Sequence, residues 1–92
     1  MQIEDFRFSK AFLGANGITV NASITTPDIS ESLLKRAAIK KAEEAYILAD
    51  SSKFGKVSFS KVCDLDEVTI VTDAKRKDIE ELCAFTRVIT VE

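Results

Sequence analysis

The chain has 92 residues, of which 46% are hydrophobic and 30% are charged, and its formal net charge is −2. This length allows one domain, and the composition is that of a globular protein. Basic and acidic residues alternate along the chain, which excludes the strongly basic surface of a DNA-binding domain. We therefore expect that this chain does not itself contact DNA.

Membrane, metal and redox functions are also not indicated. No apolar run reaches the roughly 18–20 residues that span a bilayer, and the start of the chain, MQIEDFRF, lacks the layout of a signal peptide. A cytoplasmic protein without membrane contact is expected. Cys63 and Cys83 have no CxxC spacing and the chain has no histidine, so we expect two reduced thiols, no metal site and no cofactor.

The first candidate ligand-facing segment is a glycine-rich turn. Residues 1–9 are expected to be a lead-in or a short edge strand, and the apolar residues 11–13 predict a strand that stops at Gly14. The sequence GANG of residues 14–17 is turn-forming throughout. Glycine lets backbone amides approach a ligand closely. The alternative is a tight hairpin turn into residues 18–26, which are expected to form a second strand or an extended loop.

A helix is expected over about residues 28–44. Its N-cap is either Thr26, with Pro27 as first helical residue, or Asp28 in a capping box with Glu31. Apolar residues recur every three or four positions, as in a helix that packs on a sheet: Ile29, Leu33, Leu34, Ala37, Ala38, Ala42 and Ala45.

A buried central strand and a polar loop follow this helix. Residues 46–49, YILA, are typical of a strand in a parallel sheet, reached through a right-handed crossover. The run stops at Asp50, and residues 51–53, SSK, follow where ligands bind in open α/β sheets. Hydroxyl and N–H groups donate to anionic oxygens, Lys53 adds a positive charge, and Asp50 can accept from a sugar hydroxyl. The loop suits a phosphorylated polyol, and an ordinary polar turn is the alternative.

The remainder predicts a short half-buried strand or extended arm over residues 57–62 and a strand over 68–72, which ends at Asp73 as the N-cap of a last helix. That helix is expected over about residues 74–85, and a final strand over 87–91. The result is an α/β fold, a Rossmann-like, mostly parallel sheet of four or five strands with two main helices. Two helices are few for a sheet that needs cover on both faces, so part of the domain or a partner subunit is expected to be missing.

Four blocks of the chain, in order and spacing, resemble the C-terminal effector-sensing domain of DeoR-type bacterial transcriptional repressors: KAFLGANGI, ITTPDISESLLKRAAI, YILADSSKFGKVSFSKV and VTIVTD. The resemblance covers about residues 8–91 and implies the sugar-phosphate isomerase/CoA-transferase fold. It also implies a homo-oligomeric repressor of sugar metabolism that releases DNA when a phosphorylated sugar binds. Residues 1–92 would then be the C-terminal part of the sensor domain, without the DNA-binding winged helix-turn-helix.

The family pattern further implies which residues bind the effector: Gly14, Ala15, Asn16, Gly17, Thr25, Thr26, Lys35, Asp50, Ser52 and Lys53. The glycine-rich turn would line one wall, and the two threonines would lie at the entrance of the helix, where its dipole favours anions. Lys53 would contact the phosphate. For Lys35, the alternative is a solvated partner of Glu31 at i, i+4 spacing.

Two other functions are considered. Ribose-5-phosphate isomerases resemble the chain in the glycine-rich turn and in residues 49–53, ADSSK. One alternative function is therefore that of a sugar-phosphate isomerase-like enzyme fragment. Such an enzyme needs a carboxylate base, but Asn16 and Gly17 replace the acids of the turn, and residues 34–36 read Leu-Lys-Arg where the helix acid is expected. We therefore expect no enzyme and no catalytic residue. The other alternative is an oligomerisation module without ligand binding.

Overall fold

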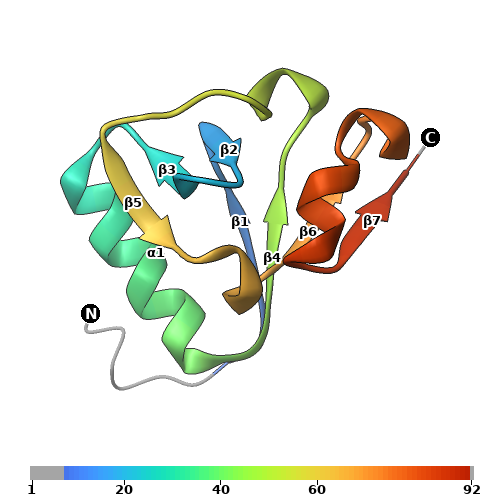
Figure 1. Ribbon diagram of the computed structural model, residues 1–92. Helices are drawn as coiled ribbons and strands as arrows, with labels where there is room; N and C mark the ends of the chain where they lie inside the picture. Colours follow the sequence, from blue (N-terminus) through green and yellow to red (C-terminus); the bar gives the residue numbers. More distant parts are fainter. Residues whose placement is uncertain (1–7, 92) are drawn as a thin grey trace.

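The computed structural model describes residues 8–91, and Figure 1 shows their path. In chain order, the strands and the α-helix are β1 (Phe8–Gly14), β2 (Gly17–Thr19), β3 (Ser23–Thr26), α1 (Ile29–Lys41), β4 (Ala42–Leu48), β5 (Ser60–Cys63), β6 (Thr69–Thr72) and β7 (Val88–Thr90). Of the lead-in or edge strand expected over residues 1–9, only Phe8 and Ser9 are described, and they begin β1. The rest lies outside the described residues.

A four-stranded parallel sheet forms the centre of the fold. Its strand order is β1-β4-β6-β7, and every neighbouring pair is parallel. Ile47 in β4 and Ile70 in β6 are fully buried, as expected for the inner strands of such a sheet. The predicted α/β fold with a mostly parallel sheet is confirmed, and so is a central strand after the helix, although β4 begins at Ala42 and ends at Leu48 and does not span residues 46–49.

The register of β1 and β4 decides where the candidate site lies. Phe12 pairs with Tyr46, and Gly14 pairs with Leu48 at the carboxyl end of both strands. The turn after β1 and the loop after β4 therefore start from adjacent points on one edge of the sheet, the edge at which ligands bind in open α/β sheets.

A second, antiparallel sheet of strand order β2-β3-β5 packs beside α1. The segment 18–26 forms β2 and β3, which pair Gly17 with Thr25 and Thr19 with Ser23. The turn of residues 14–17 is not a hairpin turn, because β1 pairs with β4 and β2 pairs with β3. It carries the chain from the parallel sheet into the antiparallel one.

The helix begins where one of the two predicted caps places it and ends earlier than predicted. Asp28 is the N-cap, and its Oδ1 accepts the Glu31 N–H at 3.1 Å. The helix stops at Lys41, and the chain enters β4 at once with Ala42 opposite Phe8. Alanine and glutamate favour helix locally, but pairing with β1 extends the backbone here, so the prediction of helix to residue 44 is wrong.

The helix also presents a different face to the sheet than predicted. Its buried residues are Ser32, Ala38 and Ile39, while Leu33 and Leu34 are 55% and 60% exposed. The Ser32 hydroxyl lies 2.7 Å from that of Ser60 and donates to the Ile29 carbonyl, and both bonds satisfy it inside the interface. The expected stripe of Ile29, Leu33 and Leu34 on the sheet is therefore wrong.

The last predicted helix is replaced by two short 3₁₀ segments, η4 (Arg76–Asp78) and η5 (Glu80–Ala84). Leu82 N–H donates to the Ile79 carbonyl and Phe85 N–H to the Leu82 carbonyl, in the i to i+3 pattern of a 3₁₀ helix. Ile79 and Leu82 are buried three positions apart, which this tighter winding matches. Within residues 8–91 the fold has one main helix and not the two expected, and Asp73 caps no α-helix.

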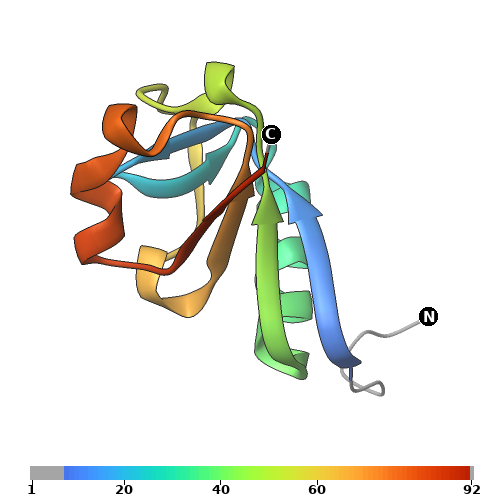
Figure 2. The same ribbon diagram turned by 90° about the vertical axis from the view of Figure 1, so that its right-hand side faces the viewer.

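One face of the parallel sheet has no cover among residues 8–91. Figure 2 shows α1 behind β1 and β4 and no described element in front of these two strands. Phe12 and Leu48 are 58% and 47% exposed there, and the Phe12 ring stacks on Tyr46 at 5.0 Å between ring centroids. The expectation of too little cover for both faces is confirmed for the described residues.

Candidate functional site

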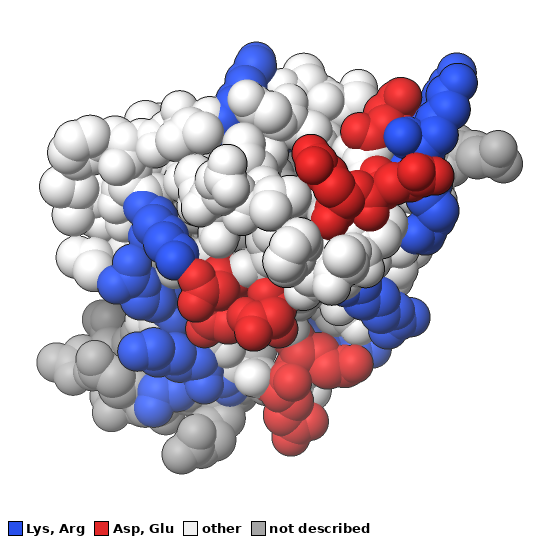
Figure 3. Space-filling view, viewed as in Figure 1, with Lys and Arg blue, Asp and Glu red and all other residues white. Residues whose placement is uncertain are grey.

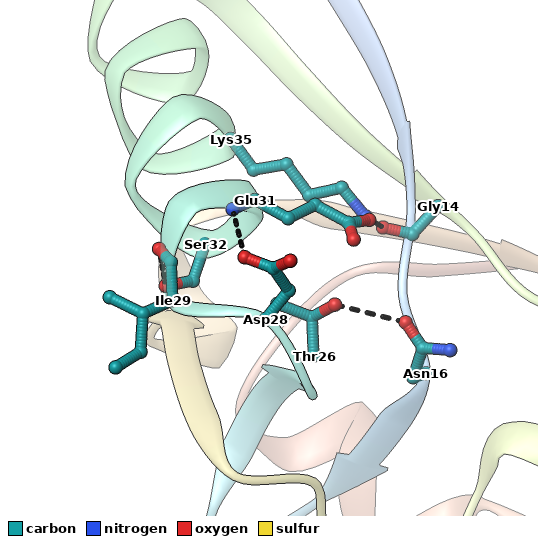
Figure 4. Close-up of polar contacts among 8 residues, drawn as sticks. All are labelled: Gly14, Asn16, Thr26, Asp28, Ile29, Glu31, Ser32 and Lys35. Atoms are coloured by element: carbon teal, nitrogen blue, oxygen red, sulfur yellow. Dashed lines mark hydrogen bonds and ion pairs between the residues drawn. The ribbon is translucent and has the colours of Figure 1, made fainter.

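The turn at the end of β1 is tied to α1 by an ammonium group. Lys35 Nζ donates to the Gly14 carbonyl at 2.7 Å and pairs with a Glu31 carboxylate oxygen, also at 2.7 Å (Figure 4). Lys35 is therefore the i, i+4 partner of Glu31 and, at the same time, a positive charge at the turn. The two interpretations of Lys35 describe the same position, because the ion pair holds the ammonium group beside Gly14.

Polar groups of β3 hold the other side of this turn. The Thr26 hydroxyl donates to Asn16 Oδ1 at 3.0 Å (Figure 4), and Asn16 N–H donates to the Thr25 carbonyl at 3.1 Å. The Thr25 hydroxyl donates to the Gly17 carbonyl and accepts the Ser58 N–H. Both threonines are buried, so their hydroxyls brace the turn, whereas Asn16 is exposed.

The loop after β4 forms a 3₁₀ turn, η2 (Ser51–Lys53), with Asp50 as its N-cap. Asp50 Oδ1 accepts from both the N–H and the hydroxyl of Ser52. These hydrogen bonds, the hydroxyl first, lower the pKa of the exposed Asp50 carboxyl, and the charges of Lys53 and Lys56 act in the same direction. Asp50 is thus held ionised as the cap of the loop, and the Ser52 hydroxyl is engaged by it.

Every backbone N–H group of this loop already has an acceptor in the protein. Ser51 N–H donates to Asp73 Oδ1 at 2.9 Å, and Ser52 N–H donates to Asp50 Oδ1. The next three N–H groups, of Lys53, Phe54 and Gly55, donate to the carbonyl oxygens of Asp50, Ser51 and Ile18. An anion at this loop would therefore be bound by side chains, of which the half-buried Lys53 has the positive charge.

The sequence analysis did not predict that Asp73 holds the loop after β4. This residue follows β6, the strand next to β4. Its carboxylate accepts the N–H of Ser51, the first N–H of the loop after β4. The available signal was its position directly after a predicted strand, because the carboxyl ends of parallel strands meet at one edge. The structure thus brings acidic side chains from two neighbouring strand ends to the loop.

The loop after β4 also contacts β2. Ile18 forms a parallel bridge with Phe54, and Gly55 N–H donates to the Ile18 carbonyl at 2.9 Å. A cavity of about 220 Å³ lies beside this contact, and it is lined by Ile18, Thr19, Val20, Phe54, Gly55, Asp78, Ile79, Glu81 and Leu82. Its walls come from β2, from the residues after η2, and from η4 and η5.

The predicted site residues therefore form two neighbouring corners. The first comprises residues 14–17 with Thr25, Thr26 and Lys35, and the second comprises Asp50, Ser52 and Lys53. No group of three or more histidine, cysteine or acidic side chains placed to hold a metal ion occurs within residues 8–91. Basic and acidic side chains are interleaved over the face in Figure 3.

Comparison with known proteins identifies the family. The profile of the DeoR C terminal sensor domain matches residues 1–74. The chain belongs to this family, and the resemblance seen in its four sequence blocks is confirmed.

Named relatives are transcriptional regulators. The chain is 50% identical over 80 residues to an uncharacterized HTH-type transcriptional regulator, FruR, of Bacillus subtilis, a match that covers 87% of this chain and 30% of the relative. It is 34% identical over 89 residues to the lactose phosphotransferase system repressor of Streptococcus mutans, covering 95% and 35% of the two chains. The HTH-type transcriptional regulator GlpR of Haloferax volcanii is 33% identical over 84 residues, covering 85% and 33%.

The chain spans about a third of the length of these curated relatives. The family is that of a sensor domain and the relatives are named as a regulator and a repressor of transcription, which agrees with the expectation that the chain is no enzyme. Within the described residues, no helix is long and apolar enough to cross a membrane.

Proposed function

We propose that this chain is the effector-sensing portion of a cytoplasmic repressor of sugar metabolism, and that it binds a phosphorylated sugar at the carboxyl ends of β1 and β4. The observation that carries the proposal is the pairing of Gly14 with Leu48, which starts both corners from adjacent strand ends. DNA would be contacted by parts of the full-length protein outside residues 1–92, as the names of the HTH-type relatives suggest.

The side chains at the two corners suit this ligand. Lys53 is the primary phosphate contact, because the ammonium group has no hydrogen bond or ion pair to another described residue and the loop N–H groups are engaged. Lys35 lies at Gly14, but its ammonium group is already paired with Glu31. The Ser51 hydroxyl and the Asn16 amide are exposed groups that can donate to a phosphate or to sugar oxygens.

Substitution of Lys53 tests the phosphate contact. A hydrogen bond to a charged group contributes roughly 1.5–3 kcal/mol, so Lys53→Ala should weaken binding of the effector about 10- to 100-fold. Isothermal titration with a panel of sugar phosphates and with inorganic phosphate measures the change. Lys77→Ala, an exposed lysine on η4, is the control and should bind as the unaltered chain does.

The same substitution in the full-length protein should leave DNA binding intact and abolish release by the effector. Release at an unchanged effector concentration would show that Lys53 does not contact the phosphate. Failure of every sugar phosphate to bind the unaltered full-length protein would refute the sensing function itself and favour an oligomerisation module.

A further inference from the structure

The cavity beside β2 lies next to the loop that contains Lys53. One of its walls is formed by residues 18–20, a second by Phe54 and Gly55, and a third by η4 and η5. In Figure 1 the loop after β4 lies above β2, and the red segment of η5 lies to the right of it. The volume of about 220 Å³ is below the roughly 300–1,000 Å³ of sites for drug-sized ligands. The cavity therefore suits a small group and not a large cofactor.

The inner surface of this cavity is apolar, with a hydroxyl group available at its side. Ile79 and Leu82 are buried in its wall, and the half-buried Phe54 adds an aromatic side chain. The Thr19 hydroxyl oxygen accepts the Ala22 N–H at 2.9 Å, which leaves the hydroxyl hydrogen for another acceptor. Apolar walls with a few polar groups are typical of small-molecule sites, and here they suit the C–H face of a sugar.

The charged side chains that line the cavity are both acidic. Asp78 and Glu81 are exposed, and neither carboxylate has a hydrogen bond or ion pair to another residue within 8–91. Lys53 and Lys56 are close in the chain to Phe54, yet neither lines the cavity. Carboxylate oxygens accept hydrogen bonds from hydroxyl groups and repel phosphate. The cavity thus favours a hydroxyl-bearing group over an anion.

We propose that this cavity binds the unphosphorylated, hydroxyl-bearing end of a sugar monophosphate, and that Asp78 and Glu81 select against a second phosphate. This assignment rests on the proposed function, in which Lys53 binds the phosphate. Phe54 follows Lys53 directly, and consecutive Cα atoms lie about 3.8 Å apart. One ligand of the size of a sugar phosphate therefore reaches from the loop into the cavity. A like charge placed against a wrong ligand is a general means of rejecting it.

Isothermal titration of the full-length protein with matched ligands tests the proposal. The probes are the 1-phosphate, the 6-phosphate and the 1,6-bisphosphate of fructose, glucose and tagatose, together with inorganic phosphate. At least one monophosphate should bind about tenfold or more tightly than the bisphosphate of the same sugar, because the second phosphate of the bisphosphate would meet two carboxylates.

A double variant tests the two acids themselves. Asp78→Asn with Glu81→Gln removes both charges and keeps the size of the side chains. It should weaken binding of the monophosphate about tenfold and reduce the discrimination against the bisphosphate. Binding of inorganic phosphate should not weaken, because Lys53 is unchanged. The matched control is Glu80→Gln, since Glu80 is an exposed acid of the same 3₁₀ segment that does not line the cavity.

The possible outcomes separate this inference from the sensing function. A bisphosphate that binds as tightly as the monophosphates, or a double variant with unchanged discrimination, overturns the role of the cavity and leaves the sensing function standing. An equal effect of Glu80→Gln would assign the discrimination to the general charge of the surface and also overturn it. Failure of every sugar phosphate to bind the unaltered protein refutes the sensing function and this inference with it. Circular dichroism checks that each variant is folded.

Discussion

At the scale of single residues, the two glycines of the turn after β1 have different requirements. Gly17 is buried, and a Cβ atom at this position would overlap the Lys56 carbonyl oxygen and lie 2.7 Å from Thr25 Oγ1. Gly14 has no atom within 4 Å of the corresponding position. Gly17 therefore permits the close approach of the loop after β4 to β2, while Gly14 leaves open space at the sheet edge.

Alanine substitution separates these two requirements. Gly17→Ala forces the backbone near Lys56 to move, and overpacking of this kind costs roughly 1–3 kcal/mol. Gly14→Ala should change the free energy of unfolding by about 0.5 kcal/mol or less, as is usual at exposed sites. Urea unfolding of both variants measures the difference, and equal stabilities would contradict the packing described around Gly17.

The buried Cys63 thiol makes the stability of the fold depend on pH in the alkaline range. Burial, with a further contribution from the Glu67 and Asp64 carboxylates, raises its pKa to about 12 from an ordinary value of 9.0. The folded chain therefore holds the thiol proton more tightly than the unfolded chain does. Stability from this proton is fully present below pH 9 and is lost as pH rises toward 12.

Comparison with Cys63→Ala isolates this effect from other titrating groups. The unaltered chain should lose more free energy of unfolding between pH 9 and 12 than the variant does, and the two should change in parallel below pH 9. Chemical denaturation at a series of pH values gives the difference. Parallel curves through the alkaline range would mean that the thiol is not protected in the folded state.

At the scale of elements, α1 shows what sequence patterns predict and what they miss. The cap at Asp28 was within reach, because aspartate three residues before Glu31 is a local signal. The face of α1 that packs on the sheets could not be predicted, because apolar periodicity does not show which surface a helix face contacts. Ser32 is buried through its bond with Ser60, which lies 28 positions away in the chain, and the leucines face outward.

The cap makes a measurable contribution to the helix. Asp28→Ala removes the acceptor of the Glu31 N–H and should lower stability by about 1 kcal/mol. Asp28→Asn keeps an acceptor oxygen and should lose much less. Thermal unfolding followed by circular dichroism at 222 nm, the usual wavelength for helix, compares the two, and equal losses would show that the charge of Asp28 and not its hydrogen bond matters.

For the candidate site, too, the sequence predicts the strand ends but not the contacts between their side chains. The positions of the turn after β1 and the loop after β4 could be predicted, because each follows an apolar run that reads as a strand. The contacts of Lys35 with Gly14 and of Asp73 with Ser51 could not, since they join residues more than 20 positions apart. Local pattern gives strand ends, and only the folded chain gives the partners of their side chains.

At the scale of the whole molecule, the described residues leave one face of the parallel sheet uncovered (Figure 2). Parallel sheets are ordinarily covered on both faces, and the chain spans about a third of its curated relatives. The exposed Phe12 and Leu48 belong to this uncovered face, whereas Leu33 and Leu34 lie beyond the helix that covers the other. The two apolar surfaces therefore lie on opposite sides of the layer formed by the sheet and α1.

The complete internal pairing of the N–H groups from Ser51 to Gly55 has a consequence for how such sensors diverge. A loop that binds its ligand through the backbone can change specificity only by changing its path. Here the path is fixed from within by Asp50 and Asp73, so neighbouring side chains can be exchanged while the scaffold stays the same. Under the proposed function, a change of ligand would then require the replacement of a few exposed side chains and not a new loop path.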